Sequence, residues 1–182
     1  MALLICSKPR TRCLPETTPL PPGLLAFFDA VESIQEPLDC SNAGPLLRDI
    51  DLSPEEAHPL CQFDDVYVRT VIRRHDRYEA ILIAWRPGQF SPIHDHGVSE
   101  CGARIIAGTA TETLYRPGVG DPGAPGYWKE GPTFRYFVGN VMLAEHGAFH
   151  RMGCDETAPE PLITLHLYSP PLLPAGVLGP AA

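Results

Sequence analysis

The 182-residue sequence predicts a single mainly β (α+β) domain, a jelly-roll barrel preceded by an N-terminal helical segment. Apolar residues recur at helical spacing in the first third of the chain, whereas short β-rich segments follow from about residue 64. The 21 prolines and 16 glycines imply many turns between those segments. A chain of this length is long enough to bury a core of its own, so one domain spanning residues 1–182 is expected.

The helical part is expected at about residues 20–62. Residues 1–22 are rich in proline and are expected to be irregular. The segment Leu24–Ile34 has its apolar residues at helical spacing, and a second helix is expected within Ser41–Asp51. A third helix is predicted to begin at Ser53-Pro54-Glu55-Glu56, because serine is a good cap, proline suits the first position and acidic residues suit the first turn.

The barrel is expected at about residues 64–171. Val66–Arg73 and Tyr78–Arg86 are rich in β-formers and are predicted to form a hairpin whose turn is Arg74–Arg77. Further short strands are expected at about 91–97, 101–108, 110–116, 133–138, 141–144, 148–152 and 161–168. The loop Pro117–Gly126 and the tail, about 172–182, are rich in proline and glycine, and the tail is expected to be extended.

The composition excludes several classes of function. A net charge of -8 argues against binding to nucleic acid or to an anionic membrane surface. The apolar start, Met1–Cys6, is too short for a signal-peptide core, and no stretch reaches the roughly 20 apolar residues of a membrane span. The six cysteines are scattered, so reduced thiols in a cytoplasmic protein are expected. No partner-binding segment is evident, and a monomer is expected.

The sequence Pro87–Cys101 contains the first metal-ligand pattern. His94 and His96 are two positions apart, so in a strand both imidazoles point the same way and can meet one ion. Imidazole is the commonest protein ligand for zinc, iron, nickel and copper. Gly88 comes six positions before His94, and Gly108 closes the unit.

The first pattern resembles the first motif of the cupin superfamily, and this resemblance implies a second motif downstream that carries a third ligand. Gly139 opens it, Gly147 follows, and His150 ends it, with Glu145 where proline is usual. His146 is an alternative third ligand, although it stands at the wrong place in the pattern. Two solvated histidines beside a proline-containing turn would be the simpler interpretation of the first pattern, but this does not account for His150.

The two patterns resemble the paired motifs of the cupin superfamily, and further residues resemble one family in it, cysteine dioxygenase. These are His94-Asp95-His96 with Cys101 five positions on, Tyr67-Val68-Arg69 upstream, and Leu165–Pro171 near the end. The resemblance spans about residues 60–171. It implies a double-stranded β-helix fold and a cytoplasmic non-haem Fe(II) enzyme that oxidises L-cysteine with O2 to cysteine sulfinate.

The resemblance also implies how metal and substrate are held. His94, His96 and His150 would bind Fe(II) and leave three adjacent positions for thiolate, amine and O2. Arg69, with Tyr67 beside it, would hold the substrate carboxylate, a role that suits the bidentate guanidinium. The alternative for Arg69 is a surface arginine, opposite the apolar face of its strand.

Thr164, His166 and Tyr168 lie at i, i+2 and i+4, so one strand face carries all three. They can form a hydrogen-bonded row that directs the tyrosine hydroxyl at the iron. In many relatives that tyrosine and a cysteine are joined by a thioether, and Tyr168 and Cys101 match the two positions. A buried small thiol and an ordinary core tyrosine are the alternative.

Other interpretations remain open on the sequence. Glu100 stands where other cupins carry a fourth, carboxylate ligand, which would suit oxyacid chemistry and leave two open positions. The interpretation that Cys101 is the site residue is preferred over Glu100 as a fourth ligand, because the Tyr168 motif makes sense only with Cys101. The substrate could instead be 3-mercaptopropionate or another small thiol, although relatives with that preference usually lack the arginine and the cysteine. A non-catalytic cupin that binds a small ligand is the alternative of another class.

Overall fold

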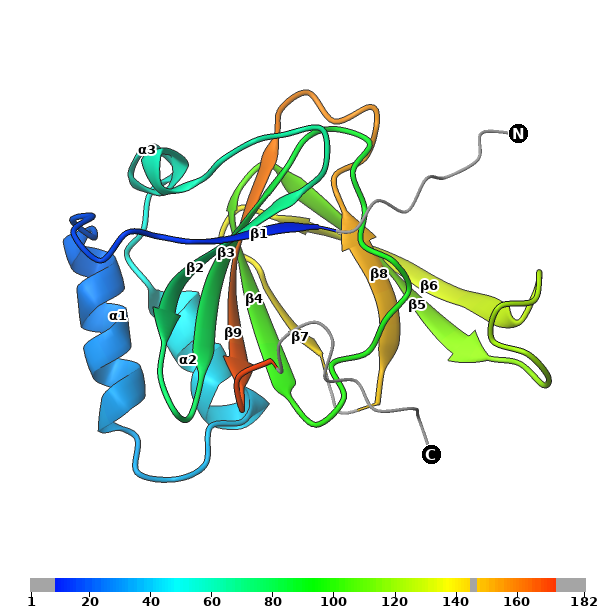
Figure 1. Cartoon of the computed structure of the whole chain (residues 1–182), viewed down its shortest axis with the longest axis horizontal. Helices are drawn as coiled ribbons and strands as arrows, with labels where there is room; N and C mark the ends of the chain where they lie inside the picture. Colours follow the sequence, from blue (N-terminus) through cyan, green and yellow to red (C-terminus); the bar gives the residue numbers. More distant parts are fainter. Residues whose placement is uncertain (1–8, 145–146, 173–182) are drawn as a thin grey trace.

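The computed structural model describes residues 9–144 and 147–172, and it confirms a mainly β fold with helices near the N-terminus. A six-stranded sheet, in the order β1-β2-β3-β9-β4-β7, faces a three-stranded sheet, in the order β6-β5-β8. The helices cover the outer side of the larger sheet, and the hairpin of β5 and β6 extends beyond the barrel (Figure 1). The strands are β1 Arg10–Cys13, β2 Val68–Arg74, β3 Glu79–Trp85, β4 Glu100–Ala107, β5 Thr109–Pro117, β6 Trp128–Phe137, β7 Val141–Ala144, β8 Phe149–Gly153 and β9 Leu162–Ser169.

Helix α1 spans Pro22–Ser33, with proline in its first turn, and α2 spans Cys40–Asp49. Helix α3, Pro54–Ala57, continues into the short 3-10 helix His58–Leu60. Helix α3 begins at the predicted residues, whereas α1 begins two residues and α2 one residue earlier than predicted. The Ser53 side chain accepts a hydrogen bond from the Glu56 backbone while the Glu56 side chain accepts one from Ser53, which closes a reciprocal cap.

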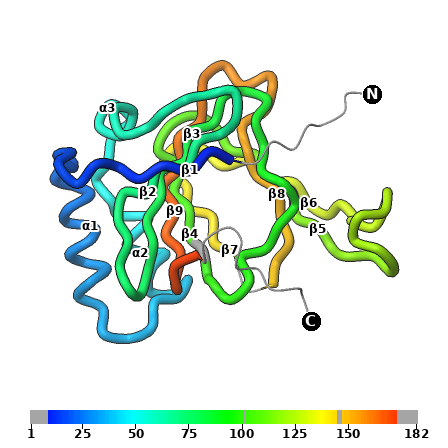
Figure 2. The backbone as a smooth tube through the Cα atoms, in the orientation of Figure 1, coloured from blue at the N-terminus to red at the C-terminus, as the bar shows by residue number. Residues whose placement is uncertain are grey.

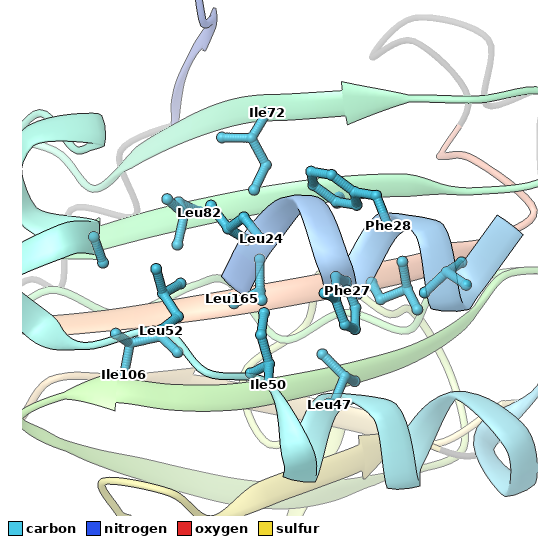
Figure 3. Close-up of a cluster of buried hydrophobic side chains, with 14 of the residues drawn as sticks. Leu24, Phe27, Phe28, Leu47, Ile50, Leu52, Ile72, Leu82, Ile106 and Leu165 are labelled. Carbon is cyan, nitrogen blue, oxygen red and sulfur yellow. The ribbon is translucent and has the colours of Figure 1, made fainter. Parts of the chain in front are cut away.

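The sheet separates two clusters of buried side chains. The outer cluster lies between the helices and the six-stranded sheet, where Phe28 of α1 and Leu47 of α2 pack towards Leu82 and Leu165 of the sheet (Figure 3). The inner cluster fills the barrel and includes Trp85. Alternate residues of β3 and β9 contribute to opposite clusters, so both faces of these central strands are apolar.

Helix α2 is fixed to β4 at both ends. At its start, the Glu100 carboxylate accepts a hydrogen bond of 2.7 Å from the Cys40 backbone N–H. At its end, the Arg104 guanidinium donates to the backbone carbonyls of Leu47, at 3.1 Å, and of the next residue. Gly102 lies between the two charged residues, and a Cβ there would overlap the Leu47 side chain. A negative side chain thus meets the positive end of the helix and a positive one the negative end.

Two expectations about the strands were wrong. The segment 91–97 is not a strand; it makes one isolated bridge to β8, His94 to His150, and a second bridge, just before the segment, joins Phe90 to Gly153. Pro92 has no amide hydrogen for a continuous ladder, and four steps of chain oppose three on β8, as in a bulge. The segment still runs alongside β8 (Figure 2). The N-terminal region is also less irregular than expected, because β1 adds to β2 in parallel.

Two further observations concern the expected setting of the protein. In the part of the chain that the structure covers, no helix is both long and apolar enough to cross a membrane. Cys13, Cys61 and Cys154 carry free thiols. The predicted extended tail falls almost wholly on residues 173–182, outside the described residues.

Candidate metal centre

Three histidines from distant parts of the chain meet inside the barrel. His94 and His96 lie on the segment between β3 and β4, and His150 lies on β8. Their potential ligand atoms all lie within 4.8 Å of one another, and the Nε2 atoms of His96 and His150 are 3.4 Å apart. The ring of His94 lies 5.2 Å from that of His96 and 4.7 Å from that of His150. Three imidazoles this close can bind one metal ion.

The backbone itself joins the two halves of this cluster. The N–H of His94 donates to the carbonyl of His150 at 2.9 Å, and the N–H of His150 donates to the carbonyl of His94 at 2.9 Å. The segment reaches β8 by way of a turn at Gly88, whose φ of 88° favours glycine. The reciprocal pair fixes both backbones, so the two imidazoles are brought together before any ligand binds.

Hydrogen bonds select the ring nitrogen that faces the centre. Nδ1 of His94 lies 3.0 Å from the carbonyl of Pro92, to which it donates. Nδ1 of His150 lies 2.5 Å from Oε1 of Glu112 and donates to that carboxylate. Each bond places the proton on Nδ1 and leaves the lone pair of Nε2 for a metal, the usual arrangement for metal-bound histidine.

Burial and neighbouring charges keep His94 and His96 uncharged. Burial, together with the neighbouring His150, lowers the pKa of His94 to about 4. Burial and then the other two histidines lower the pKa of His96 to about 3, with the Arg69 guanidinium adding to the effect. Both rings are therefore neutral at pH 7, which is the form that binds a metal.

Glu112 is a candidate site residue that the sequence analysis missed. It is buried on β5, and besides accepting from His150 it accepts a hydrogen bond of 3.0 Å from the Tyr136 hydroxyl. Burial and then the Glu112 charge raise the pKa of Tyr136, so the phenol stays protonated and donates. A signal was available, since Ala110, Glu112 and Leu114 alternate along one strand and put an acid on an otherwise apolar face.

Replacing Glu112 is expected to weaken metal binding. Glu112→Leu removes the acceptor for His150 and should raise the metal dissociation constant about 10- to 100-fold, the usual cost of losing such a partner. Glu112→Gln keeps an acceptor oxygen and should raise the metal dissociation constant less than Glu112→Leu does. Competition with a chelator of known affinity measures both constants.

Glu100→Gln is the matched control for these variants, because the Glu100 carboxylate caps α2 on the other side of the sheet. It should bind metal as the wild type does. Unchanged metal affinity in Glu112→Leu would show that the His150 ring is oriented without the carboxylate.

Arg69 reaches the same region from β2. Its guanidinium carbon lies 5.9 Å from the centre of the Tyr168 ring. The positive charge of Arg69 lowers the pKa values of His94, His96 and His166. Its Nε is buried and has no hydrogen-bond partner among the described residues. An unpaired buried donor beside neutral imidazoles is a site that favours an anion.

The row predicted on the last strand is present in β9. The Thr164 hydroxyl lies 2.9 Å from Nε2 of His166, and Nδ1 of His166 lies 3.3 Å from the Tyr168 hydroxyl. The Tyr168 ring is 5.4 Å from the ring of His96, so the row ends beside the metal centre. Tyr67 lies near the row through Trp85, on whose indole it stacks with ring centres 4.3 Å apart.

Three other candidates are placed as follows. Cys101 on β4 pairs with Tyr168 in the strand register, while its side chain lies outside the description. The Glu100 carboxylate accepts a hydrogen bond at the start of α2, and Glu100 is not one of the clustered potential metal ligands. His146, the alternative third ligand, falls outside the described residues. The fold thus brings together most of the predicted site residues, namely His94, His96, His150, Arg69 and the β9 row. Tyr67 is separated from the β9 row by the Trp85 ring.

The donor set fits a transition metal. Three clustered imidazoles, of which His94 and His150 have ordered outer partners, suit iron, zinc, copper or nickel, whereas magnesium and calcium prefer oxygen ligands. Three protein ligands also leave coordination positions for small molecules.

Comparison with known proteins identifies relatives of this chain. The family model described as Cysteine dioxygenase type I matches residues 35–175. Cysteine dioxygenase type 1 of Bos taurus is 24% identical over 138 residues, which cover 75% of this chain and 68% of that protein. The same enzyme of Homo sapiens is 25% identical over 128 residues, which cover 69% of this chain and 62% of that protein. The match thus spans about two thirds of these relatives.

Solved structures of similar shape include a double-stranded β-helix protein of Klebsiella pneumoniae and the cupin domain of Schizosaccharomyces pombe Cnp3. The first has a TM-score of 0.47 and 19% identity, and covers 62% of this chain and 85% of that chain. The second has a TM-score of 0.48 and 12% identity, and covers 62% and 70%. Similarity at this level carries no information on function.

Proposed function

The chain belongs to the cysteine dioxygenase type I family, and on that premise we propose that it is a non-haem Fe(II) dioxygenase of L-cysteine. The reaction adds both atoms of O2 to the thiol sulfur and yields cysteine sulfinic acid, R–SH + O2 → R–SO2H. Sulfur is oxidised by four electrons, which O2 accepts, so no further reductant is needed. The observation that carries the substrate assignment is the buried Nε of Arg69, which has no hydrogen-bond partner among residues 9–144 and 147–172 and lies beside three clustered histidines.

In this proposal His94, His96 and His150 hold the iron through their Nε2 atoms. Fe(II) supplies the redox chemistry that makes O2 reactive towards the thiol and stabilises the thiolate. The protein orients the substrate and limits access of water. Neutral imidazoles suit this task because they leave the iron its positive charge, which attracts a thiolate.

Arg69 is proposed to bind the α-carboxylate of cysteine. The carboxylate would accept from the guanidinium and relieve the unpaired Nε, and a bidentate pair would also fix the direction of the substrate. Tyr67 is proposed to line the same pocket. With Arg69 at one end and the metal at the other, the thiol and amine of a 2-carbon backbone are directed to the iron.

Tyr168 is proposed as the polar group beside the reacting atoms, held by Thr164 and His166. We also propose that Cys101 and Tyr168 become joined by a thioether, in which a sulfur–carbon bond replaces the S–H bond of the thiol and one C–H bond of the phenol ring, while the two electrons and two protons released reduce O2 to H2O2. The strand register supports this, because the two residues are direct partners on β4 and β9, and side chains of such partners are neighbours.

Oxygen consumption with a panel of thiols tests the proposal. Iron-loaded protein should consume about one O2 per cysteine and form the sulfinate, which NMR or mass spectrometry identifies. 3-Mercaptopropionate, which has a carboxylate but no amine, and cysteamine, which has an amine but no carboxylate, should both react more slowly. Faster turnover of 3-mercaptopropionate would reassign the substrate. No turnover of any thiol by iron-loaded protein would favour a ligand-binding role without catalysis.

A further inference from the structure

The row on β9 has a fourth member, on the neighbouring strand β3. The indole Nε1 of Trp85 lies 3.1 Å from the Thr164 hydroxyl oxygen. Trp85, Thr164, His166 and Tyr168 are all at most 4% exposed. The four side chains therefore form one continuous hydrogen-bonded series, from Trp85 at its inner end to Tyr168 beside His96.

The first bond of the series has a fixed direction. An indole N–H can donate but cannot accept, so Trp85 donates and the Thr164 oxygen accepts. The hydrogen of the Thr164 hydroxyl then needs an acceptor of its own, because a buried hydroxyl is rarely left unsatisfied. In the described part of the chain, the other group within hydrogen-bond distance is Nε2 of His166. Thr164 therefore donates to Nε2.

This direction carries through the imidazole ring. A nitrogen that accepts a hydrogen bond carries no proton, so the proton of the neutral His166 ring is on Nδ1. Burial and the Arg69 charge lower the pKa of His166, in agreement with a neutral ring. Nδ1–H then donates to the Tyr168 oxygen, 3.3 Å away. In the opposite tautomer, Tyr168 would instead give its own hydrogen to His166.

We propose that Trp85 is a positioning residue that sets the tautomer of His166, so that Tyr168 accepts from His166 and directs its own hydrogen to another partner. Removing the indole N–H removes the one donor-only group in the series. Thr164 could then accept from Nε2–H, and the whole series could reverse.

The catalytic meaning of this direction rests on the proposed function, whereas the tautomer does not. A phenol that accepts from His166 is a stronger donor towards its other side, because hydrogen bonds in a chain polarise one another. The Tyr168 ring itself lies 5.4 Å from the His96 ring and 5.9 Å from the Arg69 guanidinium carbon. Trp85 would thus act on the thiol or on oxygen through Tyr168, without touching either.

NMR of metal-free protein labelled with 15N in histidine tests the tautomer directly, since Nδ1–H and Nε2–H rings have distinct nitrogen shifts. The wild type should show His166 as the Nδ1–H form. Trp85→Phe keeps most of the ring volume and should shift the tautomer ratio towards Nε2–H by roughly 2- to 10-fold, as expected for one hydrogen bond. Trp128→Phe is the matched control, because Trp128 packs against Phe149 on the other sheet. It should leave His166 unchanged.

A second pair of variants covers the case in which Trp85→Phe does not fold. Thr164→Val removes the linking hydroxyl and should also shift His166 towards Nε2–H, while Thr164→Ser restores the hydroxyl and should retain the Nδ1–H form. Wild-type protein with His166 as Nε2–H, or a tautomer that none of these changes moves, overturns the proposal.

Iron-loaded protein gives the catalytic readout. Trp85→Phe should lower kcat for the thiol by a factor comparable to the tautomer shift, roughly 2- to 10-fold, with little change in KM. A shifted tautomer with unchanged kcat would overturn the catalytic part. Absence of thiol turnover in the wild type would count against the proposed function and leave the NMR result standing.

Discussion

His150→Ala should empty the metal centre. Wild-type protein made in iron-sufficient cells should hold up to about one iron per chain, and the variant should lose most of it because two imidazoles remain where three are needed. His94→Ala and His96→Ala should have similar effects. Elemental analysis of the purified proteins measures the metal, and circular dichroism establishes that each variant is folded.

Two other histidines serve as controls for this result. His75 lies in the β2–β3 turn, stacked on Tyr78, and His75→Ala should retain the metal. His146→Ala should retain it as well. If His146→Ala emptied the centre and His150→Ala did not, the assignment of the third ligand would be wrong, despite the position of His150 beside His94 and His96.

Arg69→Ala should cut kcat/KM for cysteine steeply. Breaking a desolvated, charge-assisted pair costs on the order of 2–5 kcal/mol, a loss of roughly 30-fold to several thousandfold. Arg69→Lys should recover part of the activity, since an ammonium keeps the charge but lacks the planar fork. Steady-state oxygen consumption with cysteine measures both variants.

Cysteamine separates substrate binding from structural support. It has the thiol and amine of cysteine but no carboxylate, so the wild type should use it poorly and Arg69→Ala should change that rate much less. Equal losses for cysteine and cysteamine would mean that Arg69 supports the structure. A wild type that prefers cysteamine would contradict the assignment of cysteine as substrate.

Features with a local cause could be predicted from the sequence. The start of α3 follows from Ser53, Pro54 and Glu56, whose side chains and backbone make the cap by themselves. The row on β9 follows from the two-residue period of a strand, which places Thr164, His166 and Tyr168 on one face wherever the strand lies.

Features that depend on which strands are neighbours could not be predicted in this way. Glu112 reaches His150 because β5 pairs with β8, and Trp85 reaches Thr164 because β3 pairs with β9. Both pairs join residues far apart in the chain, so no local pattern reports them. A strand at 91–97 predicts that His94 and His96 lie close together. The two rings are close, but an irregular segment beside β8 holds them rather than a strand.

The two contacts between α2 and β4 can form only when β4 has the correct register in the sheet. Glu100 and Arg104 are four residues apart, roughly 14 Å along a strand, and the helix residues they contact, Cys40 and Leu47, are seven residues apart, roughly 11 Å along a helix. A slip of β4 by one residue would turn both charged side chains into the barrel and away from the helix ends. A chain that paired β4 wrongly would therefore also leave α2 undocked. Both contacts of the helix thus fit the alignment that puts Cys101 opposite Tyr168.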